Sequence, residues 1–181
     1  MNFYIGCTHF FDDGILRVTE RNFPNTKEMN NFIREKWNQK IRKTNTVYLL
    51  GDVGWVWLNK DRERMEQFVE YMASLNGRKI LIIGNHDVYN LKIWEFRHCF
   101  SDIYHRLEIR DHGTKLFLYH YPVEDWNGLH TGELHLHAHT HGKGNIRKMP
   151  GRYDVSADCT RLVPVSLKEI LDDSLKVETG K

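Results

Sequence analysis

Several features that mark large classes of proteins are scarce or missing in this sequence. It has three cysteines, Cys7, Cys99 and Cys159, an odd number spread widely over 181 residues. This pattern argues against a disulfide framework and fits a protein of the reducing cytosol. The first residues also lack the basic start and the apolar stretch of a signal peptide. We therefore expect a cytoplasmic protein.

Long apolar runs and a strong charge of either sign are missing as well. No run approaches the ~20 apolar residues that a membrane-spanning helix requires, so no membrane partner is expected. The formal net charge is +2, and such a weak field does not favour nucleic acid. No repeat, linker or low-complexity stretch divides the chain. With 40% hydrophobic residues, residues 1–181 are expected to form a single domain.

Strand-like and helix-like segments alternate in the first half of the chain. Two stripes of apolar residues at helical spacing, 29–41 and 65–72, predict amphipathic helices, and Asn25 and Glu28 have the spacing of a capping box before the first. Three short apolar runs around the stripes are predicted as strands: Phe3–Ile5, Val47–Leu50 and Ile80–Ile83. This alternation predicts a parallel sheet with right-handed crossovers.

The second half has a different texture, with short strands and few helical stripes. We expect a larger share of antiparallel pairing here and one short helix at Leu167–Leu171 after Pro164. The predicted strands are Arg106–Arg110, Lys115–Tyr119, Glu133–His137 and Tyr153–Ser156.

Polar side chains follow each of the three predicted parallel strands. Cys7 and His9 follow the first, Asp52 the second, and Asn85 and His86 the third. Ligands of open α/β sheets bind beyond the carboxyl ends of the strands, so these side chains are expected at one edge. Taken singly, these groups also have a purely structural explanation, because Gly-Asp is usually a turn and Asn85 can form an Asx turn.

Histidines are numerous, eleven in all, and they cluster. His135, His137, His139 and His141 alternate along one segment, and His120 ends a predicted strand. Imidazole is the commonest neutral metal ligand, although a surface strand or a hydrogen-bonded core histidine would also explain single members. Together, the His, Asp, Asn and Cys donors favour Zn²⁺, Mn²⁺ or Fe over Ca²⁺ and indicate a metal-dependent hydrolase.

Five motifs appear in a fixed order: Cys7-Thr8-His9, Gly51-Asp52, Gly84-Asn85-His86-Asp87, His120 and Ala138-His139-Thr140-His141. In this order the chain resembles the small calcineurin-like metallophosphoesterases. The resemblance implies a four-layer α/β/β/α sandwich around two divalent metal ions. It also implies hydrolysis of a phosphate mono- or diester by a hydroxide that the two metals activate.

The resemblance assigns roles by position. Asp52 would bridge both metals, with His9 and His141 completing one site. Asn85, His120 and His139 would complete the other site. Asp52 and His86 would be catalytic, and Asn85 and His86 would contact the substrate, His86 as general acid or phosphate contact. His135 and His137 precede the last motif and are not counted as ligands.

Three positions depart from the family pattern. Cys7 replaces the first aspartate, Ala138 replaces a glycine, and Asp12 stands where many small relatives have a second histidine. A thiolate binds Zn²⁺ at ~2.3 Å and is ill suited to Mn²⁺. We therefore expect Cys7 to join the ligands and to make its site prefer Zn²⁺ or Fe, or to leave that site partly filled. Asp12 or Asp13 can be considered as a substitute oxygen donor.

The substrate is less defined than the site. The compact chain favours a small, nucleotide-like phosphoester, and no oligomeric state is indicated. Trp55, Trp57 and Trp126 follow motif strands and can stack on a base, although core packing or a dimer contact explains them equally well. The main alternative is a non-catalytic metal-binding scaffold that keeps the fold. A DNA nuclease is disfavoured, because no basic and aromatic stripe is present.

Overall fold

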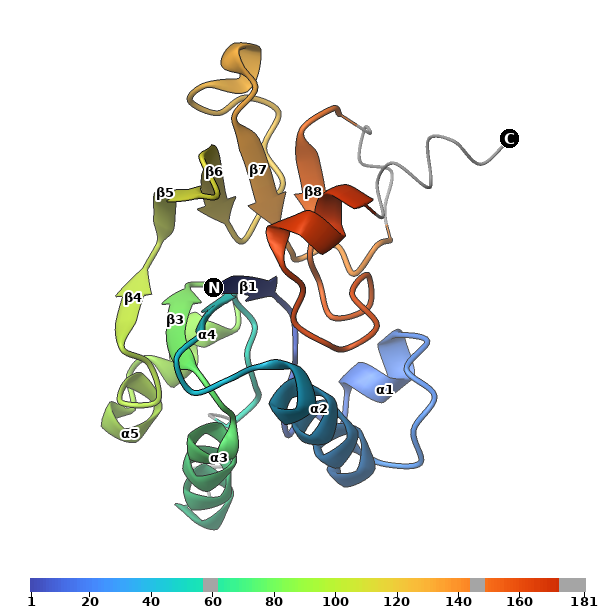
Figure 1. The fold of residues 1–181 in the computed structure, drawn as a ribbon. Helices are drawn as coiled ribbons and strands as arrows, with labels where there is room; N and C mark the ends of the chain where they lie inside the picture. The colour runs from blue at the N-terminus through green and yellow to red at the C-terminus, as the bar shows by residue number, and fades with distance from the viewer. Residues whose placement is uncertain (57–61, 144–148, 173–181) are drawn as a thin grey trace.

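The computed structural model describes residues 1–56, 62–143 and 149–172, which form two four-stranded sheets (Figure 1). The first sheet is parallel throughout, in the order β1-β2-β3-β4. Its strands are β1 Asn2–Ile5, β2 Thr46–Leu49, β3 Arg78–Ile82 and β4 Asp102–Tyr104. The three strands predicted for the first half are confirmed, and β4 joins them at the edge.

The second sheet has the order β5-β6-β7-β8. Its strands are β5 Arg106–Asp111, β6 Thr114–Tyr119, β7 Leu134–His137 and β8 Arg152–Asp154. Only β5 and β6 are antiparallel, whereas β6–β7 and β7–β8 are parallel. The expected larger share of antiparallel pairing is confirmed by this one pair, since the first sheet has none. The other two pairs are parallel because the connections at 120–133 and 138–151 are long enough to return the chain to the same end of the sheet.

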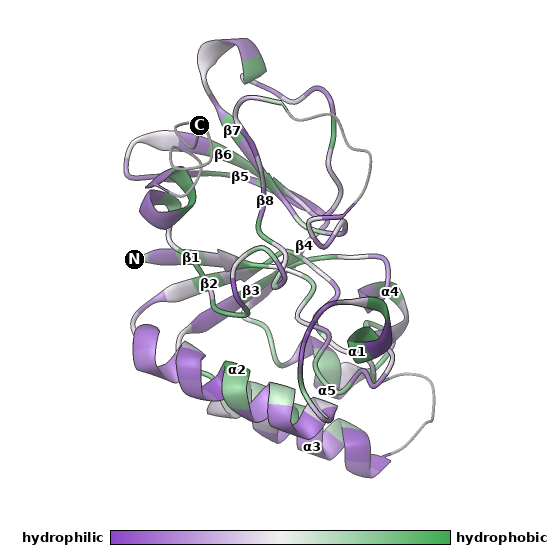
Figure 2. Ribbon diagram, turned by 90° about the vertical axis from the view of Figure 1, so that its right-hand side faces the viewer, coloured by the Kyte–Doolittle hydropathy of each residue, from purple (hydrophilic) through white to green (hydrophobic). Residues whose placement is uncertain are grey.

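Helices cover the outer face of the first sheet. Figure 2 shows α2, Thr26–Lys40, and α3, Arg62–Ser74, in one layer beside the strands. The side chain of Asn25 accepts a hydrogen bond from the backbone of Glu28 at 2.9 Å, which confirms the predicted start of α2. Four further elements are short: α1 Ile15–Val18, α4 Asp87–Asn90, α5 Trp94–Arg97 and η1 Leu129–Thr131. The short helix predicted after Pro164 is confirmed, since residues 167–172 are helical.

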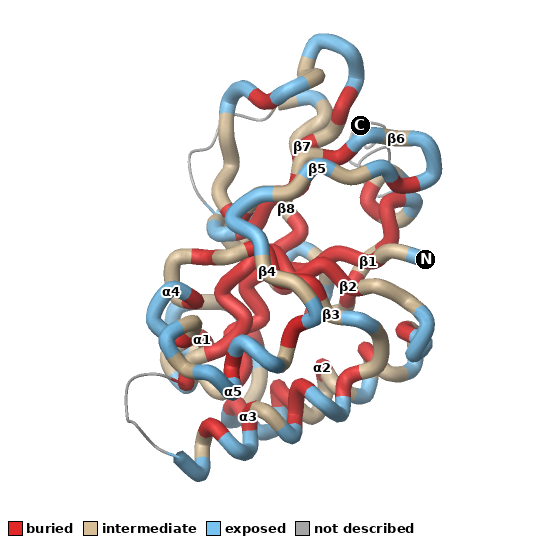
Figure 3. The backbone as a smooth tube through the Cα atoms, turned by 90° about the vertical axis from the view of Figure 1, so that its left-hand side faces the viewer, coloured by how far each residue is buried: buried red, intermediate tan, exposed pale blue. Residues whose placement is uncertain are grey.

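Two hydrophobic cores separate the layers. One lies between the helices and the first sheet and includes the fully buried Trp37 and Phe68. The other lies between the two sheets and includes Tyr4, Leu118 and Leu136. Figure 3 shows the strands of the first sheet as buried, because one of these cores lies on each face of the sheet. Among the described residues, no helix has the length and apolar character to cross a bilayer.

The predicted α/β/β/α order is confirmed, although the fourth layer is thin. Phe117 and His135 lie on the face of the second sheet opposite the core between the sheets, since side chains alternate along a strand. Trp126 covers this face, with its ring centroid 5.4 Å from that of His135 and its indole donating to the carbonyl of Glu133. Trp126 is therefore a core residue.

Candidate metal centre

The loops that follow β1, β2, β3, β6 and β7 converge at one edge of the two sheets. Close backbone contact makes this possible. A Cβ on Gly51, whose φ is +81°, would lie 2.5 Å from Nδ1 of His120, and a Cβ on Gly84 would lie 2.3 Å from Oδ1 of Asp52. A side chain at either position would displace His120 or Asp52. Glycine is therefore required at both positions, where the backbone passes close to these side chains.

Backbone strain is concentrated at the same edge. Among the described residues, only nine that are not glycine have positive φ, and five of them belong to the predicted site. Such a conformation costs of the order of 1–3 kcal/mol at each residue and persists only where the surroundings fix it. The five are Cys7, His9, Asp52, His139 and His141, with φ from 49° to 71°.

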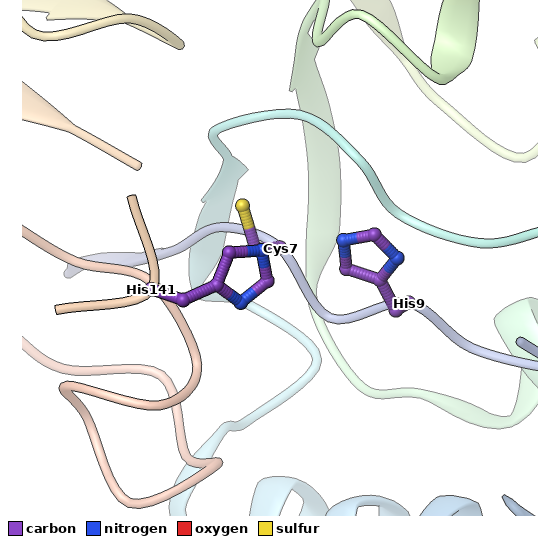
Figure 4. A group of neighbouring side chains, drawn as sticks. All are labelled: Cys7, His9 and His141. Atoms are coloured by element: carbon purple, nitrogen blue, oxygen red, sulfur yellow. The ribbon is translucent and has the colours of Figure 1, made fainter. Parts of the chain in front are cut away.

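The first donor group consists of Cys7, His9 and His141, whose ligand atoms lie within 4.8 Å of one another. Figure 4 shows the sulfur of Cys7 next to the ring of His141, with the ring of His9 to one side. Cys7 and His9 lie on the segment after β1, and His141 lies on the loop after β7. Nδ1 of His9 donates to Asp12 at 2.9 Å, and Nδ1 of His141 donates to Asp158 at 2.6 Å. Because a carboxylate only accepts, each ring keeps a lone pair on Nε2.

The second donor group consists of Cys7, Asp52 and His120, again within 4.8 Å. Nδ1 of His120 donates to the carbonyl of Leu50 at 2.7 Å. Nε2 of His120 faces Oδ1 of Asn85 at 3.0 Å and Oδ2 of Asp52 at 3.4 Å. Burial acts to lower the pKa of His120, but the hydrogen bond and charge of Asp52 raise it. Without a metal, a proton on Nε2 lies between the ring and these two oxygens, and a cation bound at this place would take the position of that proton.

Cys7 belongs to both groups, so its sulfur lies between them. The side chain is fully buried, and Sγ accepts a hydrogen bond from the backbone of His139 at 3.1 Å. The ring of His139 lies 5.1 Å from that of His120 and 4.7 Å from that of Tyr121, measured between centroids. The structure thus brings together all seven residues predicted as metal ligands.

His86 lies beside this cluster. Its backbone N–H donates to Oδ1 of Asp52 at 2.8 Å, and its partly exposed ring has its centroid 4.6 Å from Trp55 and 5.6 Å from His9.

Trp57 lies outside the described residues. His135 and His137 point to other partners, the carbonyls of Phe117 and Ala138.

The electrostatics of the cluster are dominated by burial and by Asp52. Burial acts to raise the pKa of Asp52, but the hydrogen bond and charge of His120 outweigh it and lower that pKa to about 2. Burial, together with the charge of Asp52, raises the pKa of the Cys7 thiol well above its usual value. Burial lowers the pKa of His9. The imidazole is thus kept in the neutral form that a metal ligand requires.

Three functional neighbours were not identified by the sequence. Asp87 is fully buried and accepts from the backbone N–H groups of Asp52, Val53 and Gly84, so it fixes two of the motif loops. Asp158 and Arg21 lie behind His141. The motif series contains Asp87 and can suggest it, but no local pattern indicates the other two.

Asp12 and Asp13 have different roles from the one considered for them. Asp12 accepts from His9, and Asp13 accepts from the hydroxyl of Thr26 at 2.6 Å. Neither carboxylate belongs to a donor group among the described residues. Asp12 therefore orients His9 and is not placed as a substitute ligand.

Comparison with known proteins places this geometry in a family. A family model described as calcineurin-like phosphoesterase matches residues 3–157. The chain belongs to this family. A protein of Methanocaldococcus jannaschii described as uncharacterized is 29% identical over 185 residues, covering 99% of this chain and 92% of its own.

Solved structures with similar folds come from several bacteria. A protein of unknown function from Aquifex aeolicus gives a TM-score of 0.70 at 24% identity, covering 97% of this chain and 98% of its own. The nuclease MPE of Pseudomonas putida gives 0.50 at 12% identity, covering 77% and 61%. At these identities the likeness extends to the fold of the calcineurin-like phosphoesterases, not to a substrate.

The donor set fits divalent metal ions. Nε2 of His9 is buried and has no hydrogen-bond partner among the described residues. An unpartnered buried nitrogen is costly unless something binds it. Since Cys7 and His141 place further donor atoms within 4.8 Å of His9, a cation would satisfy this nitrogen.

Proposed function

We propose that this calcineurin-like phosphoesterase hydrolyses a phosphate mono- or diester with two divalent cations. One observation carries the proposal: two donor groups of complementary chemistry share Cys7 and lie beneath the partly exposed His86. We also propose that the chain acts as one domain in the cytoplasm on a small molecule.

Each donor group would hold one cation. Cys7, His9 and His141 form a soft set that favours Zn²⁺ or Fe. The second group adds the harder oxygen of Asp52 and the nitrogen of His120 to the shared sulfur, with Asn85 and His139 beside them. Asp52 stays ionised and can offer one oxygen to each side. When bound, such a pair of cations supplies positive charge for the phosphoryl oxygens and lowers the pKa of water.

His86 and Asn85 would serve the substrate. The Asp52 carboxylate fixes the backbone of His86, while the partly exposed ring of His86 has its centroid 5.6 Å from that of His9. From there an imidazole can donate a hydrogen bond to a phosphoryl oxygen or a proton to the leaving oxygen. The amide nitrogen of Asn85 is available to the phosphate, because its oxygen faces His120.

Two aromatic side chains support a nucleotide-like substrate. The ring of Trp55 lies against that of His86, and the ring of Tyr121 lies against that of His139, so each of these two histidines has an aromatic neighbour. Trp55 and Tyr121 are partly exposed. A base can stack on such a ring, which contributes about 1–3 kcal/mol for nucleic-acid bases. Trp55→Ala is the variant that would separate base stacking from phosphate binding.

The test combines metal analysis with turnover. We expect the purified protein to bind two equivalents of metal and to hydrolyse bis-p-nitrophenyl phosphate with at least one of Mn²⁺, Zn²⁺, Ni²⁺ and Fe²⁺. Asp52→Asn should lower kcat by about 100-fold or more, because it removes the shared ligand. Asp111→Asn, a buried carboxylate bound to Tyr4, is the matched control and should keep wild-type kcat.

Other outcomes would change the assignment. Metal binding without turnover on phosphomonoesters, cyclic nucleotides, dinucleotides and oligonucleotides would indicate the non-catalytic scaffold. Equal rates for Asp52→Asn and the wild type would contradict the proposed mechanism.

A further inference from the structure

Arg21 is a buried cation that none of the five motifs explains. Its side chain is 2% exposed, and it lies in the loop between α1 and α2. The guanidinium binds both oxygens of Asp158, at 3.0 and 2.7 Å. It also donates to the backbone carbonyls of Cys7 at 2.6 Å and Thr8 at 2.9 Å. Removing either partner of such a pair leaves an uncompensated buried charge.

Asp158 connects this cation to the first donor group. The oxygen that Arg21 contacts at 2.7 Å also accepts from Nδ1 of His141 at 2.6 Å. Burial acts to raise the pKa of Asp158, but His141 and Arg21 hold it well below its usual range. A carboxylate behind a histidine fixes the tautomer and the direction of the ring and makes the ring a better ligand.

The contacts form a continuous path from one donor to another. It runs from the backbone of Cys7, which is held at a φ of 49°, through Arg21 and Asp158 to the ring of His141. Cys7 and His141 come from loops far apart in the sequence, after β1 and β7. Because Arg21 neutralises Asp158, the path orients His141 without adding net charge to the cluster.

The second donor group is oriented by other means. His120 donates to the carbonyl of Leu50, and Asp52 and Asn85 are held by contacts that involve neither Arg21 nor Asp158. Asp158 contacts His141 and Arg21, so a change to Asp158 should affect one of the two groups selectively. Arg21 also holds the backbone of Cys7, which both groups share, so a change to Arg21 can reach both.

We infer that Arg21 and Asp158 are a positioning pair for the metal bound by Cys7, His9 and His141. The pair locks His141 in the form that carries its proton on Nδ1 and directs Nε2 toward the sulfur, so that Asp158 sets the affinity of this site through His141. The inference rests on the proposed function, since it concerns one of the two metals.

Cobalt provides a readout that is independent of turnover. The full-length protein is stripped with a chelator and titrated with Co²⁺, while the near-ultraviolet absorption of a thiolate–cobalt bond reports cobalt bound to Cys7. Because both donor groups include Cys7, the affinities of the two bound equivalents are what distinguish the groups. Bound equivalents are counted by elemental analysis after dialysis against a competing chelator. We expect Asp158→Asn to weaken the site of the first donor group by about 10–100-fold and to retain the other equivalent.

The control is Asp111→Asn. This carboxylate is similarly buried, with 6% exposure, and is bound to Tyr4 and Asn2. It should retain both equivalents at wild-type affinity. If Asp158→Asn does not fold, Arg21→Lys replaces it, because lysine keeps the charge but loses the paired hydrogen bonds. We expect that variant to weaken the same site, and Asp158→Glu to restore part of the cobalt absorption.

Different results would overturn different claims. Two equivalents of Co²⁺ bound with wild-type affinities by folded Asp158→Asn or Arg21→Lys would overturn the positioning role while leaving the metal centre intact. Equal weakening of both equivalents in Asp158→Asn would also overturn it, because a general structural role would then explain the loss. A wild-type protein that binds no Co²⁺, Zn²⁺ or Mn²⁺ would contradict the proposed function itself.

Discussion

At the scale of single residues, Cys7 has the largest chemical consequence. Its sulfur belongs to both donor groups, so one substitution changes the softness of a ligand that each of them uses. The His139 amide that donates to Sγ would equally suit a carboxylate oxygen. The loop therefore has the geometry for either donor, and metal preference is decided at this position.

Cys7→Asp tests this preference directly. We expect the ratio of Mn²⁺ to Zn²⁺ affinity to rise by about 10-fold or more, since a hard oxygen replaces a soft sulfur. Isothermal titration of the stripped protein with each metal measures the change. Cys159→Ser removes an exposed thiol outside the donor groups and should leave the ratio unchanged. An unaltered ratio in Cys7→Asp would show that the thiol is not a ligand.

At the scale of elements, the sequence predicted those whose pattern is long enough to be periodic. Helices α2 and α3 and most of the strands follow from apolar spacing, and Asn25 marks the start of α2. The four-residue helices α1, α4 and α5 escaped prediction, because a single turn is stabilised by tertiary contacts and not by its own sequence. Asp87 illustrates this, since it begins α4 while its carboxylate binds the loop after β2.

The residues of the candidate site also divide into those that a local sequence pattern predicts and those that depend on tertiary contacts. Its motif residues were predictable because they occupy the ends of recognisable strands, where parallel strands bring their loops together. Arg21 and Asp158 were not, because they are 137 positions apart and meet only through the fold. Pairing at that distance leaves no local signal in a single sequence.

Strand β7 contributes a pH-dependent contact through His135. This ring is fully buried, donates to the carbonyl of Phe117 and accepts from the backbone of Val123. Burial lowers its pKa to about 4, whereas an unfolded histidine titrates near ~6.5. The unfolded state therefore binds more protons between these values, and stability should rise with pH across this window by about 3 kcal/mol.

Urea unfolding of the metal-free protein from about pH 4 to 7 measures this contribution. His135→Gln keeps one donor and one acceptor but cannot take up the proton, so its free energy of unfolding should fall less steeply as the pH is lowered. The exposed His130→Gln should retain the wild-type slope. Identical slopes for all three proteins would assign the dependence to other groups.

At the scale of the whole molecule, the candidate metal centre lies at the junction of the two sheets. Cys7, His9, Asp52 and Asn85 follow strands of the first sheet, while His120, His139 and His141 follow strands of the second. A bound cation would thus join two layers that otherwise meet through an apolar core. Ligands that bind only the folded state stabilise it by mass action.

Removal of metal should therefore lower the stability of the entire fold. At 100 times the dissociation constant, one ion contributes about 2.7 kcal/mol, which for a chain of this size corresponds to roughly 5–10 °C in Tm. Calorimetry with and without a chelator measures the shift, and added Zn²⁺ should reverse it. His141→Ala should retain only part of the shift, because one donor group remains complete. A chelator that leaves Tm unchanged would mean that the two sheets are held together without a metal, and the strained loops at their edge would then need another stabilising contact.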